Sequence, residues 1–375
     1  MNNKRIKILF FHFDLQPGGA ERVLVNLVNN LDPQKYDITV QTIFGQGQLK
    51  NAFAPNIKLK SVFNCKSIGG TRQLFKLLSP EKLHRLLIRE RYDIEIAFLE
   101  QIPTRIIGGC QTIGTKKFTW LHNTANPDRH LAIAARSWKE FLKTYSSFDK
   151  IAFVSEGARD SFYRYYPIHT PGSIVHNVVE SDNIKAMAME KIIDIPIDKD
   201  KLNLCSVGRL CGQKGYDRLF RCLVQIKKRT NRPWHLYLIG EGAEHDALVE
   251  QATHDGIIDN ITFVGFKDNP YKYVSKMDLF VCSSNFEGYS TAVTESIIVG
   301  TPVLTTNCSG MSEIFGNTKS GLIVENDEHS LENGLIQIFN NINLLTEMKI
   351  AALERSSFYS KESCIEQFEK FLEND

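Results

Sequence analysis

Residues 202–219 have the sequence LNLCSVGRLCGQKGYDRL. The first six residues are almost continuously apolar, which is typical of a parallel strand that is covered on both faces. A loop with Gly208, Gly212 and Gly215 follows, and a helix is expected to begin near Tyr216. A strand, a glycine-bearing turn and a helix in this order indicate a doubly wound α/β domain, in which ligands bind at the carboxyl ends of the strands.

The same alternation extends over the rest of the chain. Apolar runs predict strands at 7–14, 36–44, 57–63, 94–99, 117–122, 150–154, 202–207, 235–239, 261–264, 279–282, 302–305 and 321–324. Amphipathic patterns predict helices at 21–31, 81–91, 137–145, 217–228 and 243–254. The polar stretch 180–201, which contains Pro196, predicts a linker. We therefore expect two doubly wound parallel-sheet domains, formed by residues 1–180 and 181–356.

Composition excludes several classes of protein. Of the 375 residues, 42% are hydrophobic and 23% are charged, which argues against a disordered, collagen-like or coiled-coil chain. No stretch reaches the roughly 18 to 20 apolar residues that span a bilayer. His12 and Asp14 interrupt the apolar run near the start, so we expect a strand there and not a signal peptide.

The cysteines indicate the redox environment. Eight of them are scattered along the chain without any Cys-x-x-Cys pair. In a long chain without a signal peptide, this pattern favours reduced thiols in the cytoplasm and argues against a zinc site.

Charge is divided unevenly between the halves. Residues 1–180 contain 25 Lys and Arg against 15 Asp and Glu, whereas the remaining residues contain 20 against 28. The net charges are therefore +10 and −8, which suggests a basic first domain that faces an anionic partner. Solvated helix faces and docking on anionic lipid headgroups both explain the two sets of cations at i, i+3 and i+7. These sets are Lys82, Arg85 and Arg89, and Arg136, Lys139 and Lys143.

Two strand-to-helix turns carry candidate ligand-binding residues. In the turn at 16–22, the pair Gly18-Gly19 lets the backbone approach an anion, although a plain turn explains these glycines equally well. In the loop at 208–215, the Arg209 guanidinium and the Lys214 ammonium are placed to converge on a diphosphate. Two solvated cations are the simpler alternative.

A third candidate is the block Ser283-Ser284-Asn285-Phe286-Glu287-Gly288-Tyr289-Ser290-Thr291-Ala292-Val293-Thr294-Glu295. A helix is expected to begin near Ser290, so the free amides of residues 288–291 would face an anion. Glu287 in the loop and Glu295 in the helix are suited to accept hydrogen bonds from sugar hydroxyls. An N-cap role for Ser290 and a solvated position for Glu295 are the alternatives.

Glu287 and Glu295 have seven residues between them and are followed by Gly300-Thr301-Pro302-Val303. This arrangement resembles the signature of retaining, nucleotide-sugar-dependent glycosyltransferases of family four. The resemblance covers nearly the whole chain, because the family's motifs occur in order at 18–22, 208–219, 240–242, 269–271 and 287–303. It implies the GT-B architecture, with two Rossmann-like domains facing a cleft and a final helix at about 357–375 that crosses back to the first domain.

The resemblance also implies roles for individual residues. Arg209 and Lys214 would bind the donor diphosphate and stabilise charge on the departing nucleotide. Glu287 would hold hydroxyls of the donor sugar, and Glu295 those of the ribose. His122 would be the family's cleft histidine near the transferred sugar, although a histidine at a strand end is commonly structural. The other substrate-binding residues would be Gly19, Phe266 near the base, Gly288, Tyr289, Ser290 and Thr291.

The implied activity is transfer of a hexose-type sugar from a nucleoside diphosphate sugar, with UDP the expected nucleotide, to an acceptor hydroxyl. Arg209, Lys214 and the helix N-terminus would take the electrostatic role of a metal, so we expect neither a metal nor a cofactor besides the donor. The basic first domain would bind a glycan or lipid-linked glycan acceptor for bacterial surface polysaccharide, at the inner face of the membrane. We expect no nucleic-acid partner.

Three other functions fit parts of the sequence. A nucleotide-sugar epimerase shares the two-domain fold, and a catalytically silent partner subunit would retain it without transfer. An NAD-dependent oxidoreductase is disfavoured because no turn contains Gly-x-Gly-x-x-Gly. The string Asp198-Lys199-Asp200 matches the metal–diphosphate motif of another glycosyltransferase architecture, but it precedes a strand, and we interpret it as solvated surface.

Overall fold

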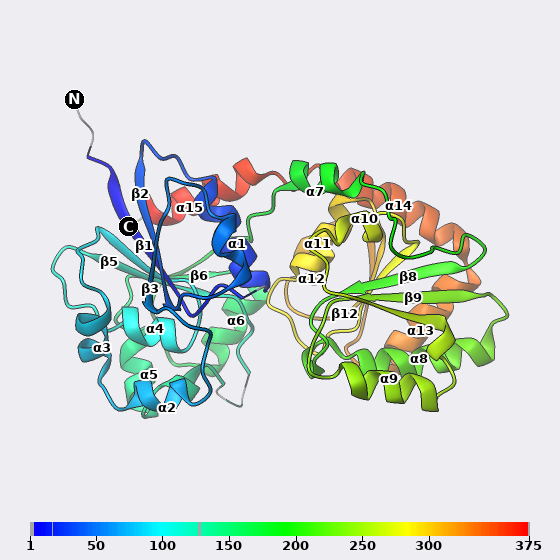
Figure 1. The fold of residues 1–375 in the computed structure, drawn as a ribbon, viewed down its shortest axis with the longest axis horizontal. Coiled ribbons are helices and arrows are strands. Elements are labelled where there is room, and N and C mark those ends of the chain that lie inside the picture. The colour runs from blue at the N-terminus through cyan, green and yellow to red at the C-terminus, as the bar shows by residue number, and fades with distance from the viewer. Residues whose placement is uncertain (1–3, 17, 127, 129, 374–375) are drawn as a thin grey trace. The chain divides into compact units, whose positions relative to one another are not determined.

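The structure of the protein is a computed structural model that describes residues 4–16, 18–126, 128 and 130–373. The chain folds into two compact units (Figure 1). Residues 1–178 and 361–375 form the N-terminal unit, and residues 179–360 form the C-terminal unit. The predicted pair of doubly wound parallel-sheet domains is confirmed.

The N-terminal unit contains a seven-stranded parallel sheet with the order β3-β2-β1-β4-β5-β6-β7. Its strands are β1 (Ile6–His12), β2 (Tyr36–Phe44), β3 (Lys58–Phe63), β4 (Ile94–Ala97), β5 (Lys116–Leu121), β6 (Lys150–Phe153) and β7 (Gly172–Ile174). The strand order changes direction between β1 and β4. The carboxyl ends of these two strands are therefore the switch point at which doubly wound sheets bind ligands.

Amphipathic helices cover this sheet (Figure 1). The last helix of the chain, α15 (Lys361–Glu373), belongs to this unit, as the resemblance predicted. The ring of Phe368 stacks on Trp120 with centroids 5.8 Å apart, and full burial of such a side chain stabilises the fold by about 1.5–3 kcal/mol. The other helices are α1 (Gly19–Asn29), α2 (Thr71–Lys76), α3 (Pro80–Leu87), α4 (Ile102–Ile107), α5 (Trp138–Tyr145) and α6 (Glu156–Tyr165), with the 3-10 turns η1 (Gln48–Ala52) and η2 (His130–Ala134).

The C-terminal unit contains a six-stranded parallel sheet with the order β10-β9-β8-β11-β12-β13. Its strands are β8 (Leu202–Val207), β9 (Trp234–Ile239), β10 (Ile261–Gly265), β11 (Leu279–Cys282), β12 (Val303–Thr306) and β13 (Gly321–Val324). The order reverses between β8 and β11, so the switch point of this sheet lies at their carboxyl ends.

The core of this unit lies between the sheet and helices such as α8 (Tyr216–Arg229), which buries Leu219, Phe220 and Leu223 completely. The spacing of these residues is that of an apolar helix face. The remaining helices are α7 (Ser181–Ala188), α9 (His245–His254), α10 (Tyr271–Val274), α11 (Thr291–Ile298), α12 (Met311–Phe315), α13 (Glu328–Asn340) and α14 (Ile342–Ser356), with the 3-10 turns η3 (Gly212–Lys214) and η4 (Ile258–Asn260).

Three sequence-based expectations need correction. The stretch 180–201 is not wholly a linker, because α7 occupies its first half and buries Ile184 and Ala188. The predicted helix 81–91 ends at Leu87, where extended backbone follows, so Arg89 lies beyond it. Strand β7 was missed because its three residues are too short to show a pattern. Within the described residues, no helix combines the length and apolar character that crossing a bilayer requires.

Candidate active site

Two loops meet at the switch point of the C-terminal sheet. The loop 208–215 follows β8, and the loop 283–290 follows β11, which pairs with β8 in parallel. The backbone N–H of Asn285 donates to the Gln213 carbonyl at 2.7 Å, and the Ser283 hydroxyl donates to the Lys214 carbonyl at 2.8 Å. Two motifs that are separate in the sequence therefore form one site.

Glycines permit this close packing of backbone. Gly215 has a φ of 61°, and a Cβ at this position would lie 2.4 Å from the Ser283 carbonyl oxygen. Gly240 has a φ of 144°, and its Cβ would lie 2.0 Å from the carbonyl oxygen of Gly208. The glycine pair at 240–242 thus lets the chain after β9 pass directly against the loop 208–215.

Lys214 and Glu287 form an ion pair at the centre of these loops. The Lys214 ammonium donates to Glu287 Oε1 at 2.8 Å, and the two side chains are only 18% and 9% exposed. The Ser284 hydroxyl donates to the same oxygen at 2.6 Å. Burial disfavours the charged ammonium, but the Glu287 carboxylate outweighs burial and raises the pKa of Lys214. The site therefore holds a fixed positive charge beside a fixed negative one.

Arg209 lies on the same loop but is not paired in this way. Its side chain is exposed and makes no hydrogen bond or ion pair with the part of the chain that the structure describes. The sequence placed Arg209 and Lys214 together on a diphosphate. The structure instead ties the ammonium of Lys214 to Glu287 and leaves the guanidinium of Arg209 unengaged.

Helix α11 begins where the sequence predicted. The Ser290 hydroxyl accepts from the Val293 N–H at 3.4 Å, so the N-cap interpretation of Ser290 is confirmed. Gly288 and Tyr289 are buried before it, and Thr291 is the first helical residue.

Glu295 and Glu287 take different partners. Glu295 lies on α11, is partly buried and accepts from the Tyr271 hydroxyl at 3.1 Å. Tyr271 is the first residue of α10, so the motif Asn269-Pro270-Tyr271 supports this carboxylate. Glu295 is therefore positioned by a neighbouring helix and is not a freely solvated residue.

Phe266 follows the last residue of β10 and is 39% exposed. Its backbone N–H donates to Glu241 Oε1 at 3.4 Å. The backbone near Phe266 was expected to contact a nucleobase, and this N–H is engaged by a carboxylate of the Gly-x-Gly turn.

Arg218, which the sequence did not reveal as a site residue, is only 8% exposed on α8. Its guanidinium donates to the Ser283 carbonyl from Nε at 2.9 Å and to the Ser284 carbonyl from Nη2 at 2.6 Å. Asn326 Oδ1 also accepts from Nη2 at 2.7 Å. Arg218 thus holds the start of the loop that carries Glu287. A charged residue at a predicted buried helix position was the signal that could have revealed it.

In the N-terminal unit, Gly19 is exposed as the first residue of α1, and His122 directly follows β5. Sequence reasoning missed the nearby Glu100, which is 5% exposed. Its Oε1 accepts from the backbone N–H groups of His122 and Asn123, at 2.5 and 2.8 Å. These two hydrogen bonds fix the backbone that presents His122, and burial raises the pKa of the Glu100 carboxyl group.

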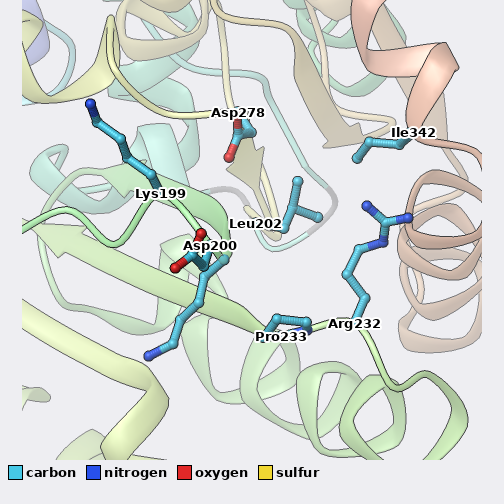
Figure 2. A pocket seen from close by; sticks show the side chains of 8 residues that line it. Lys199, Asp200, Leu202, Arg232, Pro233, Asp278 and Ile342 are labelled. Atoms are coloured by element: carbon cyan, nitrogen blue, oxygen red, sulfur yellow. The ribbon is translucent and has the colours of Figure 1, made fainter.

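A separate surface hollow of about 560 Å³ lies at the opposite edge of the C-terminal sheet (Figure 2). Leu202 begins β8, Pro233 precedes β9 and Asp278 precedes β11, so the hollow is at the amino ends of these strands. Lys199 and Arg232 project at its rim (Figure 2). The ligand-binding edge of such a sheet is the other one, and the hollow is not part of the candidate site.

One buried group in the N-terminal unit has side chains that bind metals in other proteins. His84 on α3, Glu95 on β4 and Cys110 offer ligand atoms within 4.8 Å of one another. His84 Nε2 lies 2.7 Å from Glu95 Oε2, a distance that an ion pair accounts for. All eight cysteines are free thiols, in agreement with the sequence-based expectation.

Two family models match the chain. The model described as "Glycosyltransferase Family 4" matches residues 17–183, and the model described as "Glycosyl transferases group 1" matches residues 189–355. Together they cover most of both units. The protein belongs to glycosyltransferase family 4 and has the GT-B architecture.

Individual proteins are also similar to this chain in sequence or in fold. An N-acetylgalactosamine-N,N'-diacetylbacillosaminyl-diphospho-undecaprenol 4-alpha-N-acetylgalactosaminyltransferase of Campylobacter jejuni is 33% identical over 61% of each chain, which is less than two thirds of its length. The lipopolysaccharide core biosynthesis glycosyltransferase LpsE of Rhizobium meliloti is 24% identical over 92% of each chain. The crystal structure of Anabaena Alr3699/HepE in complex with UDP and glucose superposes with a TM-score of 0.77 at 17% identity, covering 99% of this chain and 100% of that chain. At this identity, the structural match establishes the fold.

Proposed function

We propose that the protein transfers a hexose-type sugar from a UDP-sugar to a hydroxyl of a glycan or lipid-linked glycan, with retention of anomeric configuration. The observation that carries this proposal is the Lys214–Glu287 pair, held between two loops at the switch point with the unengaged Arg209 on the same loop. Support also comes from the names of similar proteins, which include a transferase acting on a diphospho-undecaprenol and a protein crystallised with UDP and glucose.

The residues of the site contact different parts of the donor. Arg209 and Lys214 bind the diphosphate and stabilise the negative charge that develops on the departing nucleotide. Glu287 keeps Lys214 charged and uses Oε1 for Lys214 and Ser284, so we assign its Oε2 to hydroxyls of the donor sugar. Glu295 accepts from ribose hydroxyls. These two cations replace a divalent metal, which makes the proposed transfer metal-independent.

A thermal-shift screen against nucleotides and nucleotide sugars tests the donor site. A ligand at 100 times its Kd stabilises a fold by about 2.7 kcal/mol, which gives a clear shift in Tm. We expect uridine nucleotides to shift the wild type but not the variant Arg209→Ala/Lys214→Ala. The matched control is Lys199→Ala/Arg232→Ala, which removes two cations from the hollow at the other edge of the sheet. The absence of any shift at millimolar concentration would favour a silent partner subunit.

Product analysis tests the chemistry. Conversion of the donor without an acceptor would identify an epimerase, whereas transfer requires both substrates. Nuclear magnetic resonance of the product reports whether anomeric configuration is retained. We expect full turnover in EDTA, and a requirement for added Mg²⁺ would contradict metal independence.

We also propose that the N-terminal unit docks on an anionic membrane surface through α3 and α5. These helices are joined by the pair Lys143–Glu81 at 3.3 Å. Lys82 and Arg85 are exposed on α3 and form no ion pair within the described chain. Leu86 is 54% exposed beside them. Each such cation contributes about 1 kcal/mol near an anionic leaflet. An apolar side chain among them strengthens binding further by inserting between the lipids.

Sedimentation with vesicles tests this surface. The full chain should bind vesicles of phosphatidylglycerol and phosphatidylcholine, and it should release them as salt is raised. The variant Lys82→Glu/Arg85→Glu should lose binding, whereas Lys227→Glu/Lys228→Glu, at the end of α8, should retain it. Equal binding to neutral vesicles would contradict the proposal.

A further inference from the structure

The one-turn helix α10 presents a tyrosine to one carboxylate of the candidate site. The Tyr271 hydroxyl donates to Glu295 Oε1 at 3.1 Å, and Tyr271 is only 4% exposed. A helix of four residues has too few internal hydrogen bonds to be stable by itself. The place of the Tyr271 hydroxyl, and with it the orientation of the Glu295 carboxylate, therefore depends on what packs against α10.

Helix α7 holds both ends of α10 through its last two carbonyl groups. The two helices are in contact within the C-terminal unit (Figure 1). Before α10, the Asn269 amide donates to the Met187 carbonyl at 2.9 Å. After α10, the Ser275 hydroxyl donates to the Ala188 carbonyl at 3.1 Å. These two side chains fix α10 against the stretch that the sequence predicted to be a linker.

The threonine that precedes β12 gives α10 a further attachment. The Thr301 hydroxyl donates to the carbonyl of Val274, the last residue of α10, at 2.7 Å. Thr301 is 1% exposed, so this hydrogen bond is shielded from water. It gives a role to one residue of the run 300–303, which is part of the family signature.

Tyr273, which also lies on α10, is held by a carboxylate from the segment after α7. Tyr273 is fully buried, and its hydroxyl oxygen lies 2.8 and 2.6 Å from the two carboxylate oxygens of Asp194. The Lys267 ammonium pairs with Asp194 at 2.6 Å and, together with the Tyr273 hydroxyl, lowers the pKa of Asp194 to about 2. Asp194 is therefore a charged acceptor at neutral pH, which strengthens the hydrogen bond from the phenol.

The segment that carries Asp194 is not held by apolar burial. Met189 is 81% exposed and Ile193 is 89% exposed. The side chains of Asp194 and Lys267 are 35% and 29% exposed, and ion pairs near the surface contribute little stability. The main consequence of this contact is geometric, because it fixes the Tyr273 ring two residues from Tyr271 on the same helical turn.

We propose that Tyr271 is a positioning residue that orients Glu295 for the ribose hydroxyls and makes the site select ribose over deoxyribose. Asp194 and Tyr273 are positioning residues that act on Tyr271 through α10. A carboxylate can accept about four hydrogen bonds, so the bond from Tyr271 is compatible with further bonds from a ribose. The role of Glu295 toward ribose rests on the proposed function, whereas the contacts that hold α10 do not.

Calorimetric titration of the full chain with UDP and with 2′,3′-dideoxy-UDP, which lacks both ribose hydroxyls, tests Tyr271. The variant Tyr271→Phe removes only the phenol oxygen. It should weaken UDP binding about 3- to 10-fold and leave the Kd of dideoxy-UDP unchanged, because only the hydroxyls use the oriented carboxylate. A general loss of structure would weaken both ligands alike. That outcome, or an unchanged Kd for UDP, would overturn the proposal.

The ratio of the two Kd values tests the contact between Asp194 and Tyr273. Tyr273→Phe and Asp194→Ala should each lower the preference for UDP about 2- to 5-fold. Asp194→Asn should recover most of it, because its amide oxygen can still accept from the phenol. The matched control is Tyr237→Phe on β9, whose hydroxyl donates to the Pro196 carbonyl of the same segment at 3.0 Å. An equal loss in this control, or no loss in Tyr273→Phe, would contradict the positioning role.

This proposal and the proposed function fail in different ways. If ADP or GDP binds and UDP does not, the choice of uridine is wrong, and the same comparison runs with that nucleotide and its dideoxy form, since all three contain ribose. UDP binding that requires Arg209 and Lys214 but ignores the ribose hydroxyls would overturn this proposal and leave the donor site intact. Binding of no nucleotide at all would refute both.

Discussion

The two switch points of this glycosyltransferase differ in the charge of the side chains that lie there. In the C-terminal unit, Lys214 and Glu287 are buried as a charged pair, and the surrounding loops satisfy them internally. In the N-terminal unit, His12 is buried and His122 is partly exposed, and the Nε2 atoms of both have no hydrogen-bond partner within the described chain. Fixed charges are suited to a diphosphate, and a neutral imidazole such as that of His122 is suited to hydroxyl groups. The same α/β scaffold thus holds a charged pair at one switch point and a neutral imidazole at the other.

The pKa values follow this division. Burial disfavours the cationic form of both Lys214 and His122 and by itself lowers the pKa of each. Glu287 reverses the effect at Lys214, whose pKa is raised, whereas the neighbouring His12 reinforces it at His122. A carboxylate in hydrogen-bond contact therefore decides whether the buried base is charged.

Removing the carboxylate of Glu287 should have the largest effect on activity. In Glu287→Gln, the amide can still accept from Lys214 and Ser284, but the fixed negative charge is lost. We expect kcat to fall about 10²- to 10³-fold, the range for loss of one preorganised electrostatic group. Steady-state kinetics measure the fall, and circular dichroism monitors the fold. Unchanged turnover in Glu287→Gln and Glu287→Ala would show that the charged pair is structural.

Arg218, which holds the loop that carries Glu287, should have a clear effect on the stability of the fold. Arg218→Ala removes the guanidinium donors of the Ser283 carbonyl, whereas the Ser284 carbonyl keeps Thr306 and Cys308 as donors. Because these partners are neutral, no buried charge is left unpaired, and we expect a loss of about 1–3 kcal/mol in the free energy of unfolding, the range for a buried acceptor that loses its donor. Arg218→Lys should recover only part, because an ammonium lacks the planar fork.

A neighbour on the same helix provides the control for Arg218. Arg221 is 46% exposed and pairs with Asp217 and Glu328, which are also exposed. Its replacement by alanine should change stability by about 1 kcal/mol or less. Denaturant unfolding of both variants separates the two cases, and equal losses would contradict a special role for Arg218.

The sequence predicted the fold of both units better than the contacts of either site. Runs such as Leu202–Val207 are apolar on both faces, so they revealed buried parallel strands without structural information. The pair Lys214–Glu287 joins residues 73 positions apart, and its geometry depends on strand order and glycine contacts. Arg218 and His12 were missed for the same reason, because the contacts of their side chains depend on the tertiary structure. Helix α7 was missed because its polar composition resembles that of a linker.

Acid and alkali should destabilise the N-terminal unit through different histidines. Burial opposes a charge on His84, but hydrogen bonds with Cys110 and Glu95 outweigh it and raise its pKa to about 9 from an ordinary 6.5. The resulting stabilisation is complete below pH 6.5 and is lost as pH rises through 9. For His122, with a pKa of about 3, the unfolded chain binds the proton first, so stability falls as pH drops from 6.5 towards 3.

Unfolding in urea between pH 4 and 10 measures both effects, each up to about 3 kcal/mol. His84→Gln should flatten the alkaline limb, and His122→Gln should flatten the acid limb. A wild-type alkaline limb that survives in His84→Gln would mean that the Glu95 pair does not set it.

The smallest effect is expected at the hollow on the amino edge of the C-terminal sheet (Figure 2). Lys199 and Arg232 are exposed there, as Arg209 is at the carboxyl edge, so the three cations resemble one another in exposure. They differ in position, because the carboxyl ends of the strands and the N-termini of the helices that follow them lie only at the carboxyl edge. Lys199→Ala/Arg232→Ala should therefore leave kcat/KM within twofold of wild type, whereas Arg209→Ala should lower it at least tenfold. A comparable loss in both would show that exposed positive charge, and not its place on the sheet, governs donor binding.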